Sequence, residues 1–139
     1  MIEATKILKS KYTVLLADDE PEIVKFFRSV FSKEGYRVIN VQNGNRVLHK
    51  VKKGGIDLVI MDVVMPNMDG MKALKELKRM APRLPVIVLS GYGDLQTARQ
   101  AMLIGAQDFI TKPFDVDFMK AVVKQAIRKA ALRTHAISK

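Results

Sequence analysis

Short apolar runs alternate with segments of helical periodicity along this chain, and that alternation limits the fold more than any other feature. Each run is rich in Val, Ile and Leu, and each is too short to be a core helix. The runs therefore predict five β-strands, at Thr13–Ala17, Arg37–Val41, Leu58–Met61, Val86–Leu89 and Asp108–Ile110.

The segments that follow these runs have the apolar spacing of amphipathic helices. From Ile23 to Phe31, apolar residues recur at i, i+3, i+4, i+7 and i+8, with Pro21 placed to begin a helix and Gly35 to end it. A strand followed by a helix, repeated along the chain, predicts a doubly wound α/β fold of the (βα)5 type. Its sheet would be parallel with helices on both faces, because each right-handed crossover must bury its helix against the sheet. The other helices are expected over Gly44–Lys53, from about Asp69, from a cap at Asp94, and from about Asp115.

The size of the chain fits a single domain. Its 139 residues, 48% of them hydrophobic, are enough to fill one core around one sheet. We expect the folded domain at residues 12–131, an N-terminal extension at 1–11, and a C-terminal tail or the start of a linker at 132–139. A stand-alone domain and the N-terminal part of a longer protein are equally compatible with this sequence.

The composition excludes several kinds of site. Without cysteine the chain forms neither a disulfide nor a thiolate metal site. No apolar run approaches the ~20 residues that a membrane span requires, so we predict a cytoplasmic protein with no membrane partner. Lys and Arg number 24 against 14 Asp and Glu, giving a formal charge of +10. Such a charge fits either a solvated basic surface or an acidic partner such as nucleic acid.

Acidic residues follow two of the predicted strands. Asp18, Asp19 and Glu20 come directly after the first strand, and Asp62 comes directly after the third. Because ligands bind at the carboxyl ends of parallel strands, we expect these carboxylates to converge at one edge of the sheet. Crowded carboxylates raise one another's pKa unless a cation neutralises them. Oxygen ligands favour Mg²⁺, whereas the EF-hand spacing typical of Ca²⁺ sites is missing.

The same edge gains a hydroxyl and an ammonium group from the last two strands. Ser90 follows the fourth strand, and Thr111, Lys112 and Pro113 follow the fifth. A carboxylate nucleophile, a divalent metal, a hydroxyl and a lysine are the groups needed to hold a phosphoryl group during transfer. Taken singly, these residues also fit plainer roles, because Lys112 could be an ordinary surface lysine and Asp is common in loops.

Four motifs in this order resemble the receiver domains of response regulators in two-component signalling. They are Leu15–Glu20, Met61–Gly70, Val88–Gly91 and Gly105–Phe114, each at the end of a predicted strand. The resemblance covers roughly residues 12 to 131. It implies a sheet with strand order 2-1-3-4-5 and a protein that accepts a phosphoryl group from a sensor histidine kinase or a phosphotransfer protein.

The resemblance also implies roles for single residues. Asp62 would be the phospho-acceptor, and Lys112 and Ser90 would bind the phosphoryl oxygens. The bond between Lys112 and Pro113 would be cis, and Gly70 would permit a backbone conformation that side chains resist. Mg²⁺ would be held by Asp18, Asp19, Asp62 and the backbone carbonyl of Val64.

The resemblance further implies a switch. Ser90 would move toward the new phosphoryl oxygens, and Phe109 would fill the space that it leaves. Many relatives have Tyr at that position, so Phe109 can act through packing alone, or it is a plain core aromatic. The fourth helix, the fifth strand and the fifth helix would form the surface that binds a downstream effector or the protein's own output domain. Val64 and Tyr92 flank the site and are expected to slow hydrolysis.

Other functions compete with this one. Phosphatases with an Asp nucleophile usually have a second acid where Val64 stands here, and Asp18–Pro21 cannot hold an FMN phosphate as a flavodoxin loop does. A basic nucleic-acid-binding module, or a phosphorylation-independent interaction module, is the remaining alternative, because Lys120, Lys124 and Arg128 form one helical row. We predict a regulator that catalyses only its own phosphorylation and dephosphorylation, with no nucleic-acid binding by this domain alone.

Overall fold

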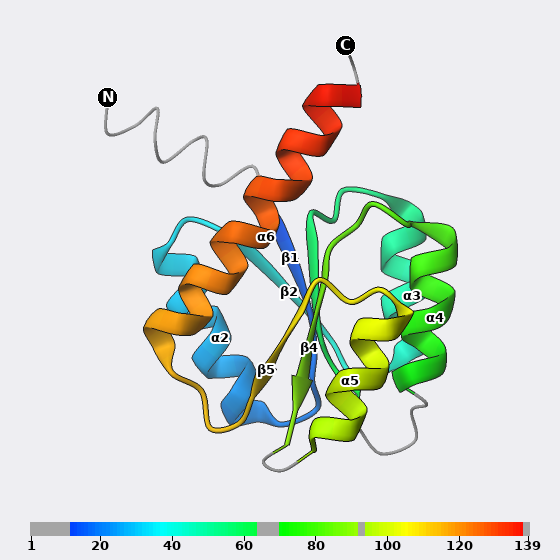
Figure 1. Cartoon of the computed structure of the whole chain (residues 1–139). Helices are drawn as coiled ribbons and strands as arrows, with labels where there is room; N and C mark the ends of the chain where they lie inside the picture. The colour runs from blue at the N-terminus through cyan, green and yellow to red at the C-terminus, as the bar shows by residue number, and fades with distance from the viewer. Residues whose placement is uncertain (1–11, 64–69, 92–93, 138–139) are drawn as a thin grey trace, which may run out of the picture.

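The computed structural model describes residues 12–63, 70–91 and 94–137, with residues 133–137 described by their backbone alone. Within them, strands and helices alternate as the sequence predicts (Figure 1). The strands are β1 (Thr13–Ala17), β2 (Arg37–Val41), β3 (Leu58–Asp62), β4 (Val86–Ser90) and β5 (Asp108–Thr111). The helices are α2 (Pro21–Lys33), α3 (Gly44–Lys53), α4 (Gly70–Met80), α5 (Leu95–Ile104) and α6 (Val116–Ile137).

All five strands form one parallel sheet in the order β2-β1-β3-β4-β5. Both the predicted fold class and the predicted strand order are therefore confirmed. β1, β3 and β4 are buried along their whole length, because helices cover both faces of the sheet at its centre. This explains why their sequences are continuous apolar runs rather than alternating ones.

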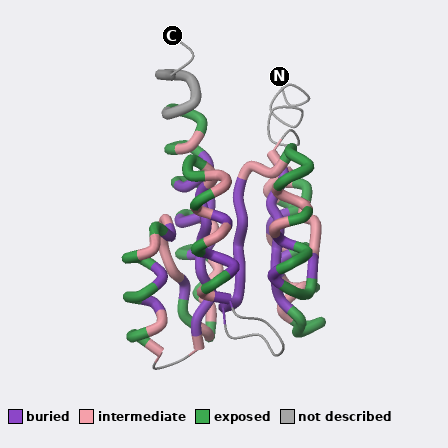
Figure 2. Tube along the Cα trace, turned by 90° about the vertical axis from the view of Figure 1, so that its right-hand side faces the viewer, coloured by how far each residue is buried: buried purple, intermediate pink, exposed green. Residues whose placement is uncertain are grey.

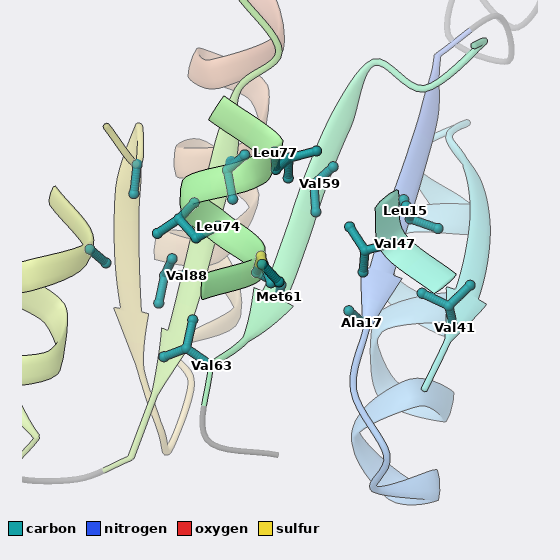
Figure 3. Packing of buried hydrophobic residues seen from close by; sticks show 14 residues of the cluster. Leu15, Ala17, Val41, Val47, Val59, Met61, Val63, Leu74, Leu77 and Val88 are labelled. Carbon is teal, nitrogen blue, oxygen red and sulfur yellow. The ribbon is translucent and has the colours of Figure 1, made fainter. Parts of the chain in front are cut away.

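Different helices cover the two faces of the sheet (Figure 1). On one face, α2 and α6 pack on the strands and bury side chains such as Phe27 and Phe31. On the other face, α3, α4 and α5 pack on the strands and bury side chains such as Val47 and Leu74. Figure 3 shows this second core, which includes Val88 of β4. Figure 2 shows the exposed residues on the outer sides of the helices. Burying one such large side chain stabilises the fold by about 1.5–3 kcal/mol, so the strand ends are firmly placed.

Three strand ends differ from the prediction by one residue. The sequence predicts that each strand ends just before Asp62, Ser90 or Thr111. In the structure these residues belong to the strands, as their last residues. The reason is register, since Asp62 lies opposite Leu89 and Ser90 lies opposite Thr111 in the parallel ladder. The functional side chains of β3 and β4 are therefore attached to sheet backbone and not to loops.

The helix starts agree with the prediction within about a residue. The Asp94 side chain accepts a hydrogen bond from the Thr97 N–H at 3.3 Å, which confirms the predicted cap, and Asp115 accepts one from Phe118 N–H at 3.0 Å. α6 continues to Ile137, so the predicted boundary after residue 131 falls inside this helix and stays a prediction. In the described part of the chain, no helix has both the length and the apolar character needed to span a membrane.

Candidate functional site

Acidic and basic side chains meet at the carboxyl edge of the sheet. Lys112, just after β5, donates a hydrogen bond from Nζ to Oδ2 of Asp62 at 2.9 Å. Its Nζ also lies 3.7 Å from Oδ2 of Asp18, which follows β1. The Lys112 backbone N–H donates to the Ser90 carbonyl at 2.9 Å, which ties the lysine to the end of β4. The structure thus brings together predicted residues from four strand ends.

Asp18 is the most deeply buried carboxylate of this edge. Its Oδ1 accepts a hydrogen bond from the Glu20 backbone N–H at 2.9 Å, whereas its buried Oδ2 has no hydrogen-bond partner among the described residues. Burial raises the pKa of the Asp18 carboxyl above its ordinary value, and the Glu20 N–H and the Lys112 ammonium oppose this effect without cancelling it. A buried carboxylate oxygen in this situation is a ready ligand for a hard cation.

Carboxylate oxygens of Asp18, Glu20 and Asp62 all lie within 4.8 Å of one another. This spacing and the unpartnered Oδ2 of Asp18 fit an oxygen-liganded divalent cation such as Mg²⁺. The predicted ligand Asp19 is exposed and does not belong to this cluster, so its role stays a prediction. Val64, whose carbonyl is the other predicted ligand, and Tyr92 lie outside the described residues.

Glu20 is among the carboxylates that the sequence predicts at this edge, but it was given no role as a metal ligand or as a partner of Lys112. Its Oε1 lies 3.2 Å from Lys112 Nζ, although the Glu20 side chain is 59% exposed. The available signal was the position of Glu20, two residues after Asp18, where the chain turns into α2. From that turn, the Glu20 carboxylate lies close to the Lys112 ammonium, which Asp18 and Asp62 also approach.

Lys112 lies among these three carboxylates. Burial alone would lower the pKa of its ammonium group. The hydrogen bond to Asp62 and the charges of Asp62 and Asp18 outweigh burial, so the pKa of Lys112 lies above its ordinary value. The side chain is therefore a permanent cation at neutral pH. The peptide bond between Lys112 and Pro113 is cis, as predicted.

The predicted switch residues differ in their surroundings. Ser90 is fully buried, and its Oγ has no hydrogen-bond partner in the described structure. A buried hydroxyl without a partner is uncommon and is available to a ligand oxygen. Phe109 is partly buried and packs against the core that underlies α3, α4 and α5. Their predicted movements remain predictions.

Gly70 is needed for a reason other than the predicted one. Its backbone does not have the left-handed conformation, which is found at Gly35, Gly54, Gly55 and Gly105. A Cβ atom on Gly70 would lie 2.4 Å from the Cα atom of Val63 and 2.5 Å from its carbonyl oxygen. The start of α4 therefore rests directly on the backbone next to Asp62, and no side chain fits between them.

Asn40 on β2 holds the turn that presents Asp18. Its Nδ2 donates to the carbonyl oxygens of Leu16 at 3.0 Å, Asp18 at 3.2 Å and Val41 at 3.2 Å. The Asp18 N–H adds a bond to the Val41 carbonyl at 3.3 Å. The edge strand thus fixes the backbone of the buried carboxylate, a role that the sequence reasoning did not predict.

The fold and this edge define an α/β regulatory domain with an acidic site at the carboxyl ends of its strands. The chain belongs to the response regulator receiver domain family, whose sequence model matches residues 14–124. The family predicted from the four motifs is therefore confirmed. Members are the phosphorylation-dependent switching domains of two-component systems, and the cluster of Asp18, Glu20 and Asp62 fits that chemistry.

Known relatives agree with this assignment. The regulatory protein AtoC of Escherichia coli is 35% identical over 120 residues, which are 86% of this chain and 26% of AtoC. Sporulation initiation phosphotransferase F of Bacillus subtilis is 36% identical over 112 residues, which are 81% of this chain and 90% of that protein. The structure of a response regulator receiver domain protein from Clostridium thermocellum matches with a TM-score of 0.81 and 31% identity, covering 87% of this chain and 98% of that one. The chain thus spans about a quarter of AtoC but most of the other two proteins.

Proposed function

We propose that this domain accepts a phosphoryl group on Asp62 from a sensor histidine kinase or a phosphotransfer protein, with Mg²⁺ bound beside it. The observation that carries the proposal is the contact of Lys112 Nζ with Asp62 Oδ2 at 2.9 Å, next to the buried Oδ2 of Asp18, which has no hydrogen-bond partner in the described structure. These contacts support the proposal, because the Lys112 ammonium, the carboxylate that would be the nucleophile and an oxygen that would bind the metal lie close together. We place the domain in the cytoplasm, where such a kinase presents its phosphorylated histidine.

The transfer is an in-line displacement at phosphorus. A carboxylate oxygen of Asp62 attacks the phosphorus of a phosphohistidine, and the P–N bond breaks as the P–O bond forms, leaving the electron pair on the imidazole nitrogen. Lys112 and Ser90 would bind the oxygens of the transferred group. When bound to Asp18, Asp62, Asp19 and the Val64 carbonyl, Mg²⁺ would neutralise negative charge as it builds up.

The domain would catalyse only its own phosphorylation and the hydrolysis of its acyl phosphate. Its output would be a changed surface formed by α5, β5 and α6, which binds a downstream effector or an output domain of the same protein. Ser90 at the end of β4 and Phe109 on β5 would connect that surface with the site. To change the ratio of active to inactive domains from 1:99 to 99:1, phosphorylation must favour the active state by about 5.5 kcal/mol.

A nucleic-acid-binding or phosphorylation-independent function is the alternative. Lys124 and Arg128 are exposed on α6 and Lys120 is partly exposed, so the predicted basic row faces solvent. If this row binds DNA, affinity will fall steeply with salt concentration, since each phosphate contact releases a counterion. Salt-independent or absent DNA binding excludes the nucleic-acid function, whereas the phosphorylation test below decides the phosphorylation-independent one.

The proposal is tested by intact mass after incubation with Mg²⁺ and a small phosphodonor. We expect the wild type to gain one phosphoryl group, Asp62→Asn to gain none, and EDTA to abolish the gain. A folded wild type that binds Mg²⁺ but gains no mass, from the phosphodonor or from a phosphorylated kinase, contradicts the proposal.

A further inference from the structure

A groove of about 480 Å³ lies between α4 and α5, and none of the carboxylates of the acidic site is among its lining residues. Leu103 on α5 is 81% exposed, more than any other large hydrophobic side chain in the described part of the chain. Single exposed leucines are ordinary on protein surfaces, but this one shares the groove with Met71 and Ile104. The groove is lined by Met71, Lys72, Lys75, Gln100, Leu103 and Ile104.

The charge of this groove has one sign. Lys72 and Lys75 are exposed along its α4 wall, and no carboxylate is among the lining residues. A groove between two helices with apolar side chains and an ammonium rim is complementary to an amphipathic helix that carries acids beside large apolar residues. Nucleic acid fits less well, because its phosphate backbone offers nothing to cover Leu103 and Met71. The formal charge of +10 would also speed the approach of an acidic partner.

Both walls of the groove connect to the acidic site. Met71 directly follows Gly70, which rests on the backbone of Val63, the residue after Asp62. On the α5 wall, Ile104 packs against the same core as Phe109. A displacement at the end of β3 can therefore be transmitted through packed contacts to the α4 wall, and a displacement of Phe109 to the α5 wall.

We propose that the α4–α5 groove binds an acidic amphipathic helix of a partner protein, and that phosphorylation changes its affinity. The second part rests on the proposed function of Asp62. This surface is distinct from the α5–β5–α6 surface, because its other wall is α4 and its charged rim consists of α4 lysines.

The test uses two labelled synthetic helices of about four turns, ~14 residues, with Leu along one face. One has Glu on both sides of the Leu stripe, and the other has Lys at the same positions. Fluorescence anisotropy with the full chain should show the Glu peptide binding at least about tenfold more tightly than the Lys peptide. Equal binding of the two peptides, or no binding of the Glu peptide, overturns the proposal.

Variants locate the binding site. Leu103→Gln and Lys75→Glu should each weaken the Glu peptide about tenfold. Leu132→Gln and Lys124→Glu on α6 are matched controls, since Leu132 is 62% exposed and Lys124 is exposed, and they should stay within about twofold. Circular dichroism checks that all four variants are folded. Losses as large in the α6 variants place the site elsewhere and overturn the proposal.

The phosphorylation arm repeats the titration with Mg²⁺ and a phosphodonor, for the wild type and Asp62→Asn, with intact mass read from the same samples. A changed affinity in the phosphorylated wild type alone supports the proposal. An unchanged affinity in a sample that carries the phosphoryl group overturns the regulatory part and leaves the proposed function standing. A wild type that gains no mass from the phosphodonor or from a phosphorylated kinase contradicts the proposed function and, with it, the phosphorylation dependence, while the variants still decide whether the groove binds.

Discussion

Polar side chains at the amino edge and at the carboxyl edge of the sheet differ in their hydrogen bonding. At the amino edge, Asp57 accepts the Thr13 N–H at 2.7 Å, and its own N–H donates to the Thr13 carbonyl at 2.9 Å. At the carboxyl edge, Asp18 Oδ2 and Ser90 Oγ are buried and have no hydrogen-bond partner within the described part of the chain. Leaving a buried polar group unpaired costs about 1–3 kcal/mol. The amino edge is therefore stabilised by its own hydrogen bonds, whereas the carboxyl edge has buried polar atoms that a ligand would satisfy.

The largest expected effect is on phosphoryl transfer, which should depend on the carboxyl edge and not on the amino edge. Asp62→Asn should abolish phosphoryl transfer, because an amide oxygen is too weak a nucleophile. Asp57→Ala should keep phosphoryl transfer and lose about 1–3 kcal/mol of unfolding free energy, because the Thr13 N–H loses its acceptor. Intact mass and denaturant unfolding measure the two quantities. Loss of phosphorylation in folded Asp57→Ala would remove the distinction.

Asp18→Asn should change metal binding and stability in opposite directions. Mg²⁺ affinity should fall about tenfold or more, because a charged ligand is lost. Without metal the melting temperature should rise, because burial raises the pKa of Asp18 and the neutral amide avoids the cost of burying a charge. Calorimetric titration and thermal melts in EDTA are the measurements. A variant with a lower metal-free melting temperature and unchanged Mg²⁺ affinity would show that Asp18 is structural.

Asn40→Ala and Asn43→Ala form a matched pair. Each should lose about 1 kcal/mol of unfolding free energy, the first from the bonds to the Asp18 turn and the second from the cap bond to the Arg46 N–H at 2.9 Å. Only Asn40→Ala should also weaken Mg²⁺ binding, by about threefold to tenfold, because it loosens the backbone of Asp18. Equal Mg²⁺ affinities in the two variants would refute the positioning role of Asn40.

Glu20→Gln should have the smallest effect. Its ion pair with Lys112 is largely exposed, so the unfolding free energy should change by less than about 0.5 kcal/mol. Mg²⁺ affinity should fall about twofold to threefold, because one negative charge leaves the cluster. A tenfold loss would instead identify Glu20 as a direct metal ligand, and calorimetric titration distinguishes the two results.

The fold was predictable because its signals are local. The apolar runs, Pro21 and the Asp94 cap each reflect a residue's own neighbourhood, and the structure agrees with them. The site was predictable as a set of residue types at strand ends, and Asp18, Asp62 and Lys112 do meet. Details that depend on contacts between distant segments were missed, namely the ion pair of Glu20 with Lys112 and the hydrogen bonds of the Asn40 amide.

The reason for Gly70 was missed on the same physical grounds. Glycine in a sequence suggests an unusual backbone angle, whereas here the limit is the 2.4 Å that would separate a Cβ atom at this position from Val63 Cα. Such a clash depends on how the start of α4 packs against the backbone at the end of β3, and no local sequence pattern predicts it. Likewise, the strand ends at Asp62 and Ser90 are set by pairing with Leu89 and Thr111, which the composition of each run does not encode.

The central claim is that the unpartnered buried atoms of the carboxyl edge are binding groups for a metal and a phosphoryl group. The most direct test is a crystal structure grown with Mg²⁺ and beryllium fluoride, a phosphoryl analogue. We predict Mg²⁺ on Oδ2 of Asp18, the analogue on Asp62, and contacts from Lys112 Nζ and Ser90 Oγ to its fluorine atoms. A structure in which Asp18 Oδ2 and Ser90 Oγ remain unpartnered while both ligands bind elsewhere would contradict the account.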